Sequence, residues 1–284
     1  IEHAILHLLY SRFFTKGINN FYKDFNITEP FKNLFTQGMV CHETYKDKKG
    51  NWLYPDEIEK KGTDKAVKKN DRSEVSIGPS ESMSKSKKNT IDPEVMIKKY
   101  GADAVRWFIL SDSPPEKDVQ WSDVGVISSN KFLQKLWNLN LIIMNRKDKN
   151  FKNGKDKEFN LEIENIISKI DTSINEFKFN VSIALFYETY KILNNYLNDN
   201  VTNKILIENI TKIMKLMIPF VPHIANECLD LLNCKNKNEW PKIKKDLQSK
   251  IKFAVQINGK TRDILTIKKD LEKDNVMQSI ISNS

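Results

Sequence analysis

The residues best suited to chemistry lie in one short loop, residues 82–89, which we call the lysine loop. It reads Ser-Met-Ser-Lys-Ser-Lys-Lys-Asn, and Asp92 and Pro93 follow closely. Aspartate favours the N-cap of a helix and proline its first turn, so a helix is predicted to begin there. Ammonium groups, hydroxyls and N–H groups beside a positive helix end suit a polyphosphate. The loop is therefore predicted to close over a nucleotide, although its composition also fits a solvated basic surface.

The net charge of the chain favours a polyanionic partner. The 284 residues carry 46 Lys and Arg against 37 Asp and Glu, a formal charge of +9 that is spread along the chain. This balance suits nucleic acid or nucleotide phosphates, and the length allows about two domains. An anionic membrane is the rival partner, but no apolar run reaches the length of a membrane span and no signal peptide opens the chain. We therefore expect no membrane partner.

The cysteines and histidines give little sign of a metal centre. Cys41, Cys228 and Cys234 are far apart and lack paired metal-ligand spacing, so they are predicted to be reduced thiols of a cytosolic protein. His3 and His7 have the i, i+4 spacing that can hold a metal on one helix face. Because no acidic or cysteine partner stands at a suitable distance, we expect no metal site.

The first part of the chain is predicted to be mixed α/β. Residues 3–14 are apolar on nearly every face, which is typical of a helix buried against a sheet. Residues 35–45 indicate a strand, with Gly38 allowing close backbone approach, and residues 52–54 a returning strand. Residues 57–73 are charged and lack an apolar period, so we expect them on the surface. Elements expected to flank the lysine loop are a strand over 75–78 and helices over 93–100 and 102–110.

The second part is predicted to be all-α. Apolar residues recur at helical spacing from 122 to about 232, which indicates four or five amphipathic helices in a bundle. Its predicted core positions are Phe132, Leu136, Leu139, Ile163, Ile167, Ile170, Ile174, Phe177, Phe186, Tyr190, Leu193, Leu197, Leu206, Ile210, Ile213, Met217, Val221, Ala225, Cys228 and Leu232. Beyond a charged linker, residues 251–257 alternate like a half-buried strand before an Asn258-Gly259 hairpin turn. A helix is expected after residue 268.

In this order, the motifs resemble the C-terminal half of a class I aminoacyl-tRNA synthetase, specifically of the leucyl-tRNA synthetase family. The resemblance covers essentially the whole chain. Its carriers are Ile1-Glu2-His3-Ala4-Ile5-Leu6-His7-Leu8-Leu9-Tyr10, Thr36-Gln37-Gly38-Met39-Val40, the lysine loop, Tyr100-Gly101-Ala102-Asp103-Ala104-Val105-Arg106 and Val255-Gln256-Ile257-Asn258-Gly259-Lys260.

The resemblance implies a fold class of α/β plus all-α. Residues 1–75 would be the second half of a Rossmann-like catalytic domain, and 76–114 the lysine-loop and stem-contact region. Residues 115–240 would form the tRNA-binding bundle, and 250–284 the start of a small α+β domain. The family's His-Ile-Gly-His half and its editing domain are missing, so this chain alone is expected to be inactive.

The resemblance also implies the chemistry: activation of leucine by ATP, with Mg2+ as part of the substrate complex, then transfer to tRNA(Leu). The enzyme is expected to be a cytoplasmic monomer without a tightly bound cofactor. Lys85 would contact the migrating phosphates, Ser84 and Ser86 would shape the loop, and Met83 would lie near the adenine. The remaining implied positions are Gly38, Met39 and Val40 at the adenine, Glu2 at the ribose, and His3 and His7 in the leucine pocket.

One departure and two alternatives accompany this interpretation. The family's loop usually begins with lysine, whereas this chain has Ser82, and loss of one charged hydrogen bond costs about 1–3 kcal/mol. Lys87 or Lys88 could compensate. The valyl, isoleucyl and methionyl enzymes share the loop and the bundle, and a non-catalytic RNA-binding module derived from such an enzyme is the other alternative.

Overall fold

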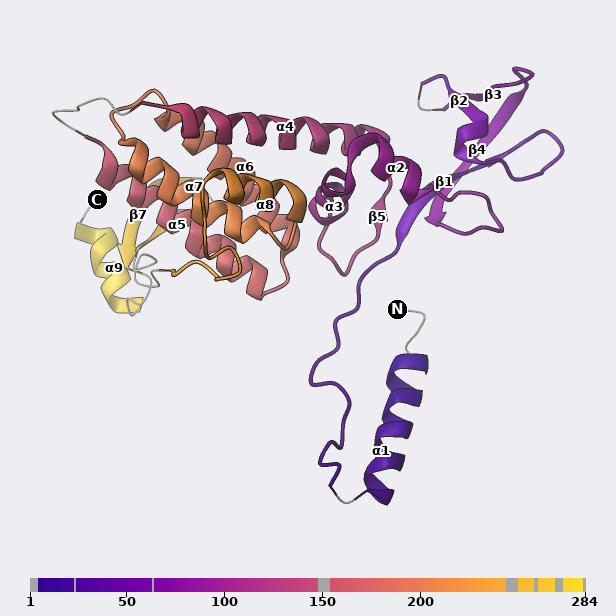
Figure 1. Cartoon of the computed structure of the whole chain (residues 1–284), viewed down its shortest axis with the longest axis horizontal. Helices are drawn as coiled ribbons and strands as arrows, with labels where there is room; N and C mark the ends of the chain where they lie inside the picture. The colour runs from indigo at the N-terminus through magenta and orange to yellow at the C-terminus, as the bar shows by residue number, and fades with distance from the viewer. Residues whose placement is uncertain are drawn as a thin grey trace. The chain divides into compact units, whose positions relative to one another are not determined.

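A computed structural model describes residues 5–22, 24–62, 64–147, 154–243, 250–257, 260–268 and 273–282. The chain divides into two compact units (Figure 1). The sheet unit comprises Ile1–Met96 and Asp112–Gly125, and the helical unit comprises Ile97–Ser111 and Val126–Ser284.

The sheet unit begins with a π-helical turn, η1 (Ile5–Tyr10), which continues into α1 (Ser11–Phe21). The prediction of a buried helix here is wrong for the described chain. Phe13 is 68% exposed, Phe14 65% and Phe21 85%, and no residue of α1 is buried. The described strands instead bury their apolar side chains against one another, in a cluster of Tyr45, Leu53, Ile58, Ala66 and Val75.

Five strands of the sheet unit form a mixed sheet in the order β2-β3-β4-β1-β5. They are β1 (Val40–Lys46), β2 (Ile58–Lys60), β3 (Ala66–Lys68), β4 (Glu74–Ser82) and β5 (Val119–Gln120). All pairs are antiparallel except β1 with β5. A β-bulge between Glu43 and Thr44 interrupts the β1–β4 register.

Two expectations for this sheet need correction. Residues 57–73 are not simply surface, because they contain β2 and β3, whose Ile58 and Ala66 are buried. The strand expected over 52–54 is reduced to a single bridge between Lys46 and Trp52. A short 3-10 turn, η2 (Pro55–Glu57), follows it.

The helices predicted around residue 100 are confirmed as α2 (Pro93–Tyr100) and α3 (Ala102–Ser111). Asp92 Oδ1 accepts the Glu94 N–H at 2.8 Å, which is the predicted N-cap. Gly101 separates the helices with φ +84°, a left-handed conformation that glycine adopts without strain.

The helical unit is a bundle of α4 (Asp123–Asn145), α5 (Asp156–Asn175), α6 (Phe179–Tyr196), α7 (Asn203–Met217) and α8 (Pro222–Leu231). In it α5 packs on α6 and α7, α7 packs on α8, and α3 packs on α6 and α8 (Figure 1). Most predicted core positions are buried, but Phe177 is 49% exposed because the chain turns there with φ +57°. Trp107 is fully buried, and its Nε1–H donates to Tyr187 Oη at 3.0 Å.

Two side chains of α3 hold the turn between α7 and α8. Asp103 is nearly buried, and its carboxylate accepts the N–H groups of His223 at 3.3 Å and Ile224 at 2.7 Å, at the start of α8. One turn along α3, Arg106 donates from Nε to Phe220 O at 2.9 Å and from Nη2 to Pro219 O at 2.6 Å. We call this pair the α3 clamp. It satisfies donors at one end of a helix and carbonyls just before it, groups that a helix cannot satisfy internally.

The C-terminal residues form a hairpin of β6 (Lys250–Ile257) and β7 (Lys260–Lys268), followed by α9 (Lys273–Ser282). The strands pair antiparallel with a bulge between Val255 and Gln256. The predicted hairpin and helix are confirmed, while the Asn258-Gly259 turn lies outside the described residues.

Candidate nucleotide-binding loop

The lysine loop starts where β4 ends and is held by the neighbouring strand. Ser82, the last residue of β4, pairs with Cys41 of β1. The next residue, Met83, donates its N–H to Val40 O at 3.0 Å. The entry to the loop is therefore fixed to β1 by sheet hydrogen bonds.

Asn89 fixes the exit of the lysine loop, and sequence reasoning missed it. It is fully buried, and its Nδ2 lies 3.1 Å from His42 O, 3.1 Å from Glu81 O and 3.4 Å from Ser82 O. Its Oδ1 accepts the Ser84 N–H at 2.8 Å. One amide thus joins the loop to both β1 and β4. The sequence signal was weak, since an asparagine after three lysines also suits an exposed turn.

Between these anchors, the loop forms a tight turn of short contacts. The hydroxyls of Ser84 and Ser86 lie 2.7 Å apart, and the Lys88 N–H donates to Lys85 O at 3.3 Å. Lys87 forms an ion pair with Glu81. Lys88 has φ +53°, and its Nζ lies 5.1 Å from the centre of the Tyr54 ring. Both candidates to replace a lysine at position 82 therefore have partners within the protein.

Lys85 is exposed at the edge of a hollow of about 650 Å³. The other lining residues are Tyr54, Pro55, Asp56, Thr90, Ile91, Asp92, Pro93, Val95 and Met96. The start of α2 thus lies beside Lys85, as the sequence predicted. Its positive end is already capped by Asp92, and Asp56 adds a second carboxylate, so the hollow has mixed charge.

The strand beside the loop has a neutral histidine. His42 Nδ1 lies 3.0 Å from Glu43 O, and burial lowers the pKa of the imidazole. Burial likewise raises the pKa of the Cys41 thiol. All three cysteines are free, as predicted. Neither group adds charge beside the loop at neutral pH, so the lysines and the nearby carboxylates set its electrostatics.

Gly38 makes a close backbone approach, but its partner is the protein itself. A Cβ at Gly38 would lie 2.1 Å from Lys117 O, and the Gly38 N–H donates to Pro115 O at 2.8 Å. The Met39 N–H donates to Asp118 Oδ1 at 2.8 Å, and Met39 O accepts the Val119 N–H at 2.9 Å. Packing against residues 115–118 therefore explains the glycine, and the adenine-binding role stays a prediction. Of residues 38–40, Met39 alone is exposed.

The structure brings together Met83, Ser84, Lys85 and Ser86 in the loop, and Val40 beside Met83. Glu2 and His3 lie outside the described residues, and of His7 only the backbone, in η1, is described. No group of three His, Cys, Asp or Glu side chains that could hold a metal ion occurs among the described residues. In the same part of the chain, no helix is both long and apolar enough to cross a bilayer.

We expect the replacement Asn89→Ala to loosen the lysine loop. It leaves buried carbonyls and the Ser84 N–H without their amide partner, at a cost of about 1–3 kcal/mol. If trypsin cuts the loop after local opening, cleavage at Lys85, Lys87 and Lys88 should accelerate about 5- to 150-fold. Mass spectrometry of timed digests measures this.

The matched control for this prediction is Asn70→Ala, in an exposed turn of the same unit. It should leave cleavage of the loop at the wild-type rate. An Asn89→Ala protein with wild-type cleavage of the loop would show that the amide does not anchor it.

Two family models match the chain. "Anticodon-binding domain of tRNA ligase" matches residues 156–277, and "tRNA synthetases class I (I, L, M and V)" matches residues 77–122. The second match contains the lysine loop and most of β4. The first covers the bundle from α5 onwards and much of the C-terminal hairpin and helix.

The chain is also similar to curated leucine–tRNA ligases. It is 38% identical to that of Ehrlichia chaffeensis over 283 residues, 96% of this chain and 33% of the relative. It is 40% identical to that of Rickettsia massiliae over 288 residues, 99% of this chain and 34% of the relative. The chain thus spans about a third of the length of the curated relatives it matches.

A solved structure shares the fold. It is the ternary complex of Agrobacterium radiobacter K84 agnB2 LeuRS with tRNA and LeuAMS, with a TM-score of 0.68 and 27% identity. The match covers 99% of this chain and 33% of that chain. The mixed sheet and the many helices therefore match part of a class I synthetase.

Proposed function

We infer that this chain, which belongs to the class I leucine–tRNA ligase family, contributes a nucleotide-closing loop and a tRNA-binding bundle to the ATP-dependent joining of leucine to tRNA. The observation that supports this function is the anchored conformation of the lysine loop. It is fixed at its entry by Met83 and at its exit by Asn89, and it holds Lys85 exposed between them.

In the proposed reaction, a leucine carboxylate oxygen attacks the α-phosphorus of ATP. A bond forms from that oxygen to phosphorus, and the bond to the bridging oxygen breaks, releasing pyrophosphate. The leucyl group then passes to a ribose hydroxyl of tRNA and AMP leaves. Negative charge on the phosphates moves towards the leaving pyrophosphate, and the Lys85 ammonium would stabilise it there.

The mixed charge around Lys85 fits a phosphate that arrives as its Mg2+ complex. The carboxylates of Asp56 and Asp92 would repel a bare polyphosphate, whereas oxygen ligands suit Mg2+. We assign Mg2+ to the substrate complex and propose no tightly bound cofactor.

The other site roles follow the family resemblance. Ser84 and Ser86 would shape the loop through their mutual hydrogen bond, and Met83 would lie near the adenine. Gly38, Met39 and Val40 would approach the adenine, the Met39 side chain being best placed because its N–H and carbonyl are already bonded. Glu2 would bind the ribose, and His3 and His7 would line the leucine pocket.

The finer domain assignment is part of the proposal. Residues 1–75 would belong to the second half of a Rossmann-like domain, 76–114 to the loop and stem-contact region, 115–240 to the tRNA-binding bundle and 250–284 to a small C-terminal α+β domain. The charge of +9 supports backbone contacts to tRNA(Leu) that weaken with salt. We propose a cytoplasmic enzyme that acts as a monomer.

The test is ATP–pyrophosphate exchange by the intact gene product that contains this chain. We expect exchange to require leucine and to fall to background without it. Exchange that depended instead on valine, isoleucine or methionine would contradict the leucyl assignment. Absence of exchange with any amino acid would favour the non-catalytic RNA-binding module.

A further inference from the structure

A tyrosine outside the lysine loop contacts one of the loop's lysines. The Lys88 Nζ lies 5.1 Å from the centre of the Tyr54 ring. An ammonium is attracted to an aromatic face within about 6 Å of the ring centre. Tyr54 also lines the hollow at whose edge Lys85 lies. The contact therefore joins the loop to a segment that precedes β2 and β3 in the sequence.

The backbone on both sides of Tyr54 is fixed. The preceding residue, Leu53, is buried in the sheet core and donates its N–H to Tyr45 O at 2.9 Å. The Tyr54 N–H donates to Glu57 Oε2 at 2.7 Å, and Tyr54 O accepts the Glu57 N–H at 3.0 Å. Tyr54 thus stands between a contact to β1 and the capped start of η2. A ring on such a backbone can restrain a flexible lysine side chain.

The backbone of Lys88 has an unfavourable conformation. Its φ of +53° lies in the left-handed region, where a Cβ crowds the neighbouring carbonyl and only glycine is free of strain. The chain turns there because the Lys88 N–H donates to Lys85 O at 3.3 Å, while the next residue, Asn89, is fully buried. A lysine keeps such a conformation only where surrounding contacts hold it.

The conformation of Lys88 also determines the position of Lys85. The two residues are joined by the hydrogen bond that closes the turn, so a relaxed φ at Lys88 would shift Lys85 relative to the hollow. Small displacements of a group that acts on reacting atoms lower the rate of a reaction strongly. A contact that holds Lys88 therefore has an effect at Lys85.

We propose that Tyr54 is a positioning residue for Lys85. Its ring binds the Lys88 ammonium and keeps the turn in the conformation that presents Lys85 to the nucleotide. The role of Lys88 is then conformational, and its ammonium does not contact the phosphates. This deepens the proposed function and rests on it for the nucleotide. The effect of Tyr54 on the loop can be measured without any activity.

The first test is trypsin cleavage after Lys85 in the intact gene product, followed by mass spectrometry. Tyr54→Ala should accelerate this cleavage about 2- to 5-fold, as expected for loss of one partly exposed cation–π contact. Tyr54→Phe keeps the aromatic face and should be cut at the wild-type rate. Lys88→Ala loses the ammonium and keeps the strain, so it should be cut at least as fast as Tyr54→Ala. Lys88→Gly loses both and should be cut near the wild-type rate.

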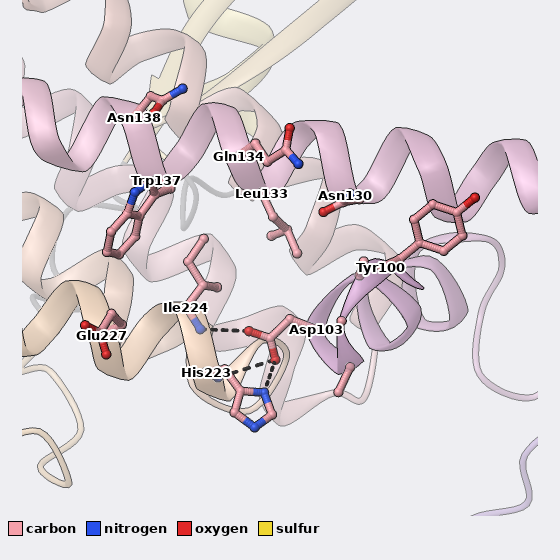
Figure 2. A pocket seen from close by; sticks show the side chains of 13 residues that line it. Tyr100, Asp103, Asn130, Leu133, Gln134, Trp137, Asn138, His223, Ile224 and Glu227 are labelled. Atoms are coloured by element: carbon pink, nitrogen blue, oxygen red, sulfur yellow. Dashed lines mark hydrogen bonds and ion pairs between the residues drawn. The ribbon is translucent and has the colours of Figure 1, made fainter. Parts of the chain in front are cut away.

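The matched control is Tyr100→Ala, because Tyr100 has a contact of the same kind. The Lys99 Nζ lies 5.0 Å from the centre of the Tyr100 ring, at the end of α2. Tyr100 belongs to the helical unit, where it lines a separate hollow of about 720 Å³ beside α3, α4 and the start of α8 (Figure 2). Tyr100→Ala should leave cleavage after Lys85 at the wild-type rate. Equal acceleration by Tyr100→Ala and Tyr54→Ala would overturn the proposal.

The second test is leucine-dependent ATP–pyrophosphate exchange. Tyr54→Ala should lower kcat about 2- to 5-fold and leave the KM for leucine unchanged, because the ring acts on the loop and not on leucine. Lys88→Gly should exchange at about the wild-type rate. When Lys88→Gly is already present, Tyr54→Ala should have no further effect, because glycine keeps the turn without a bound ammonium. A merely structural role for Tyr54 would lower exchange equally with and without Lys88→Gly.

Three results would overturn the proposal. Loss of exchange in Lys88→Gly as large as in Lys85→Ala would place the Lys88 ammonium on the phosphates. Wild-type cleavage and exchange in Tyr54→Ala would show that the ring does not hold the loop. Additive effects of Tyr54→Ala and Lys88→Gly would show that the two residues act separately. The expected cleavage pattern without leucine-dependent exchange in the wild-type protein would contradict only the proposed function.

Discussion

Replacing Lys85 with alanine is expected to lower leucine-dependent ATP–pyrophosphate exchange by about 100- to 1,000-fold in the intact gene product. Removing one donor to charge that develops in a transition state costs about that much, or roughly 2.7–4 kcal/mol. The effect should be large here because Lys87 is paired with Glu81 and Lys88 lies over Tyr54. Lys85 is exposed, so the urea midpoint of unfolding should not change.

Two companion variants make this prediction specific. Lys85→Arg keeps a positive charge and should recover part of the lost exchange. Lys48→Ala removes a lysine of the same unit whose side chain is 71% exposed, and exchange should stay within about twofold of wild type. If Lys85→Ala exchanged as fast as Lys48→Ala, the phosphate role of Lys85 would be wrong.

The second large effect is expected at Asp103. Asp103→Ala should reduce the free energy of unfolding of the chain by about 2–4 kcal/mol. Hydrogen bonds to a charged group contribute about 1.5–3 kcal/mol, and this carboxylate accepts two N–H groups at the start of α8. Urea unfolding followed by far-ultraviolet circular dichroism measures the change, since the bundle supplies most of the helical signal.

The controls for Asp103 distinguish its charge from its shape. Asp103→Asn keeps one acceptor oxygen and should cost roughly half as much. Glu188→Ala, at an exposed acidic residue of α6, should stay within about 0.5 kcal/mol of wild type. Equal unfolding energies for Asp103→Ala and Glu188→Ala would show that Asp103 does not stabilise the start of α8.

Local patterns predicted the bundle well because helix faces repeat within a few residues. Ile163, Ile167 and Ile170 are fully buried, as their spacing indicates. The prediction that Phe177 is a core residue was wrong because the helix ends before it, at Asn175. Strands β2 and β3 were missed because each has three residues with one buried, which is too short to show a period.

The parts of the candidate site that could not be predicted from the sequence depend on contacts with backbone groups far away along the chain. The buried Asn89 side chain donates a hydrogen bond to the carbonyl of His42, which precedes it by 47 residues. Gly38 was correctly predicted to make a close approach, but only the structure shows that Lys117 is on the other side. The segment around Asp103 and Arg106 carried the family resemblance, and its role as a clamp required the positions of α7 and α8.

The central proposal is that this chain is part of an enzyme that joins leucine to tRNA. Charging of tRNA by the intact gene product, measured with radiolabelled amino acids and ATP, tests it most directly. We predict that leucine is transferred, and that valine, isoleucine and methionine are each used about 10- to 200-fold less efficiently, as expected for an apolar pocket. Preferential transfer of one of those three amino acids, or tRNA binding without transfer of any, would contradict the claim.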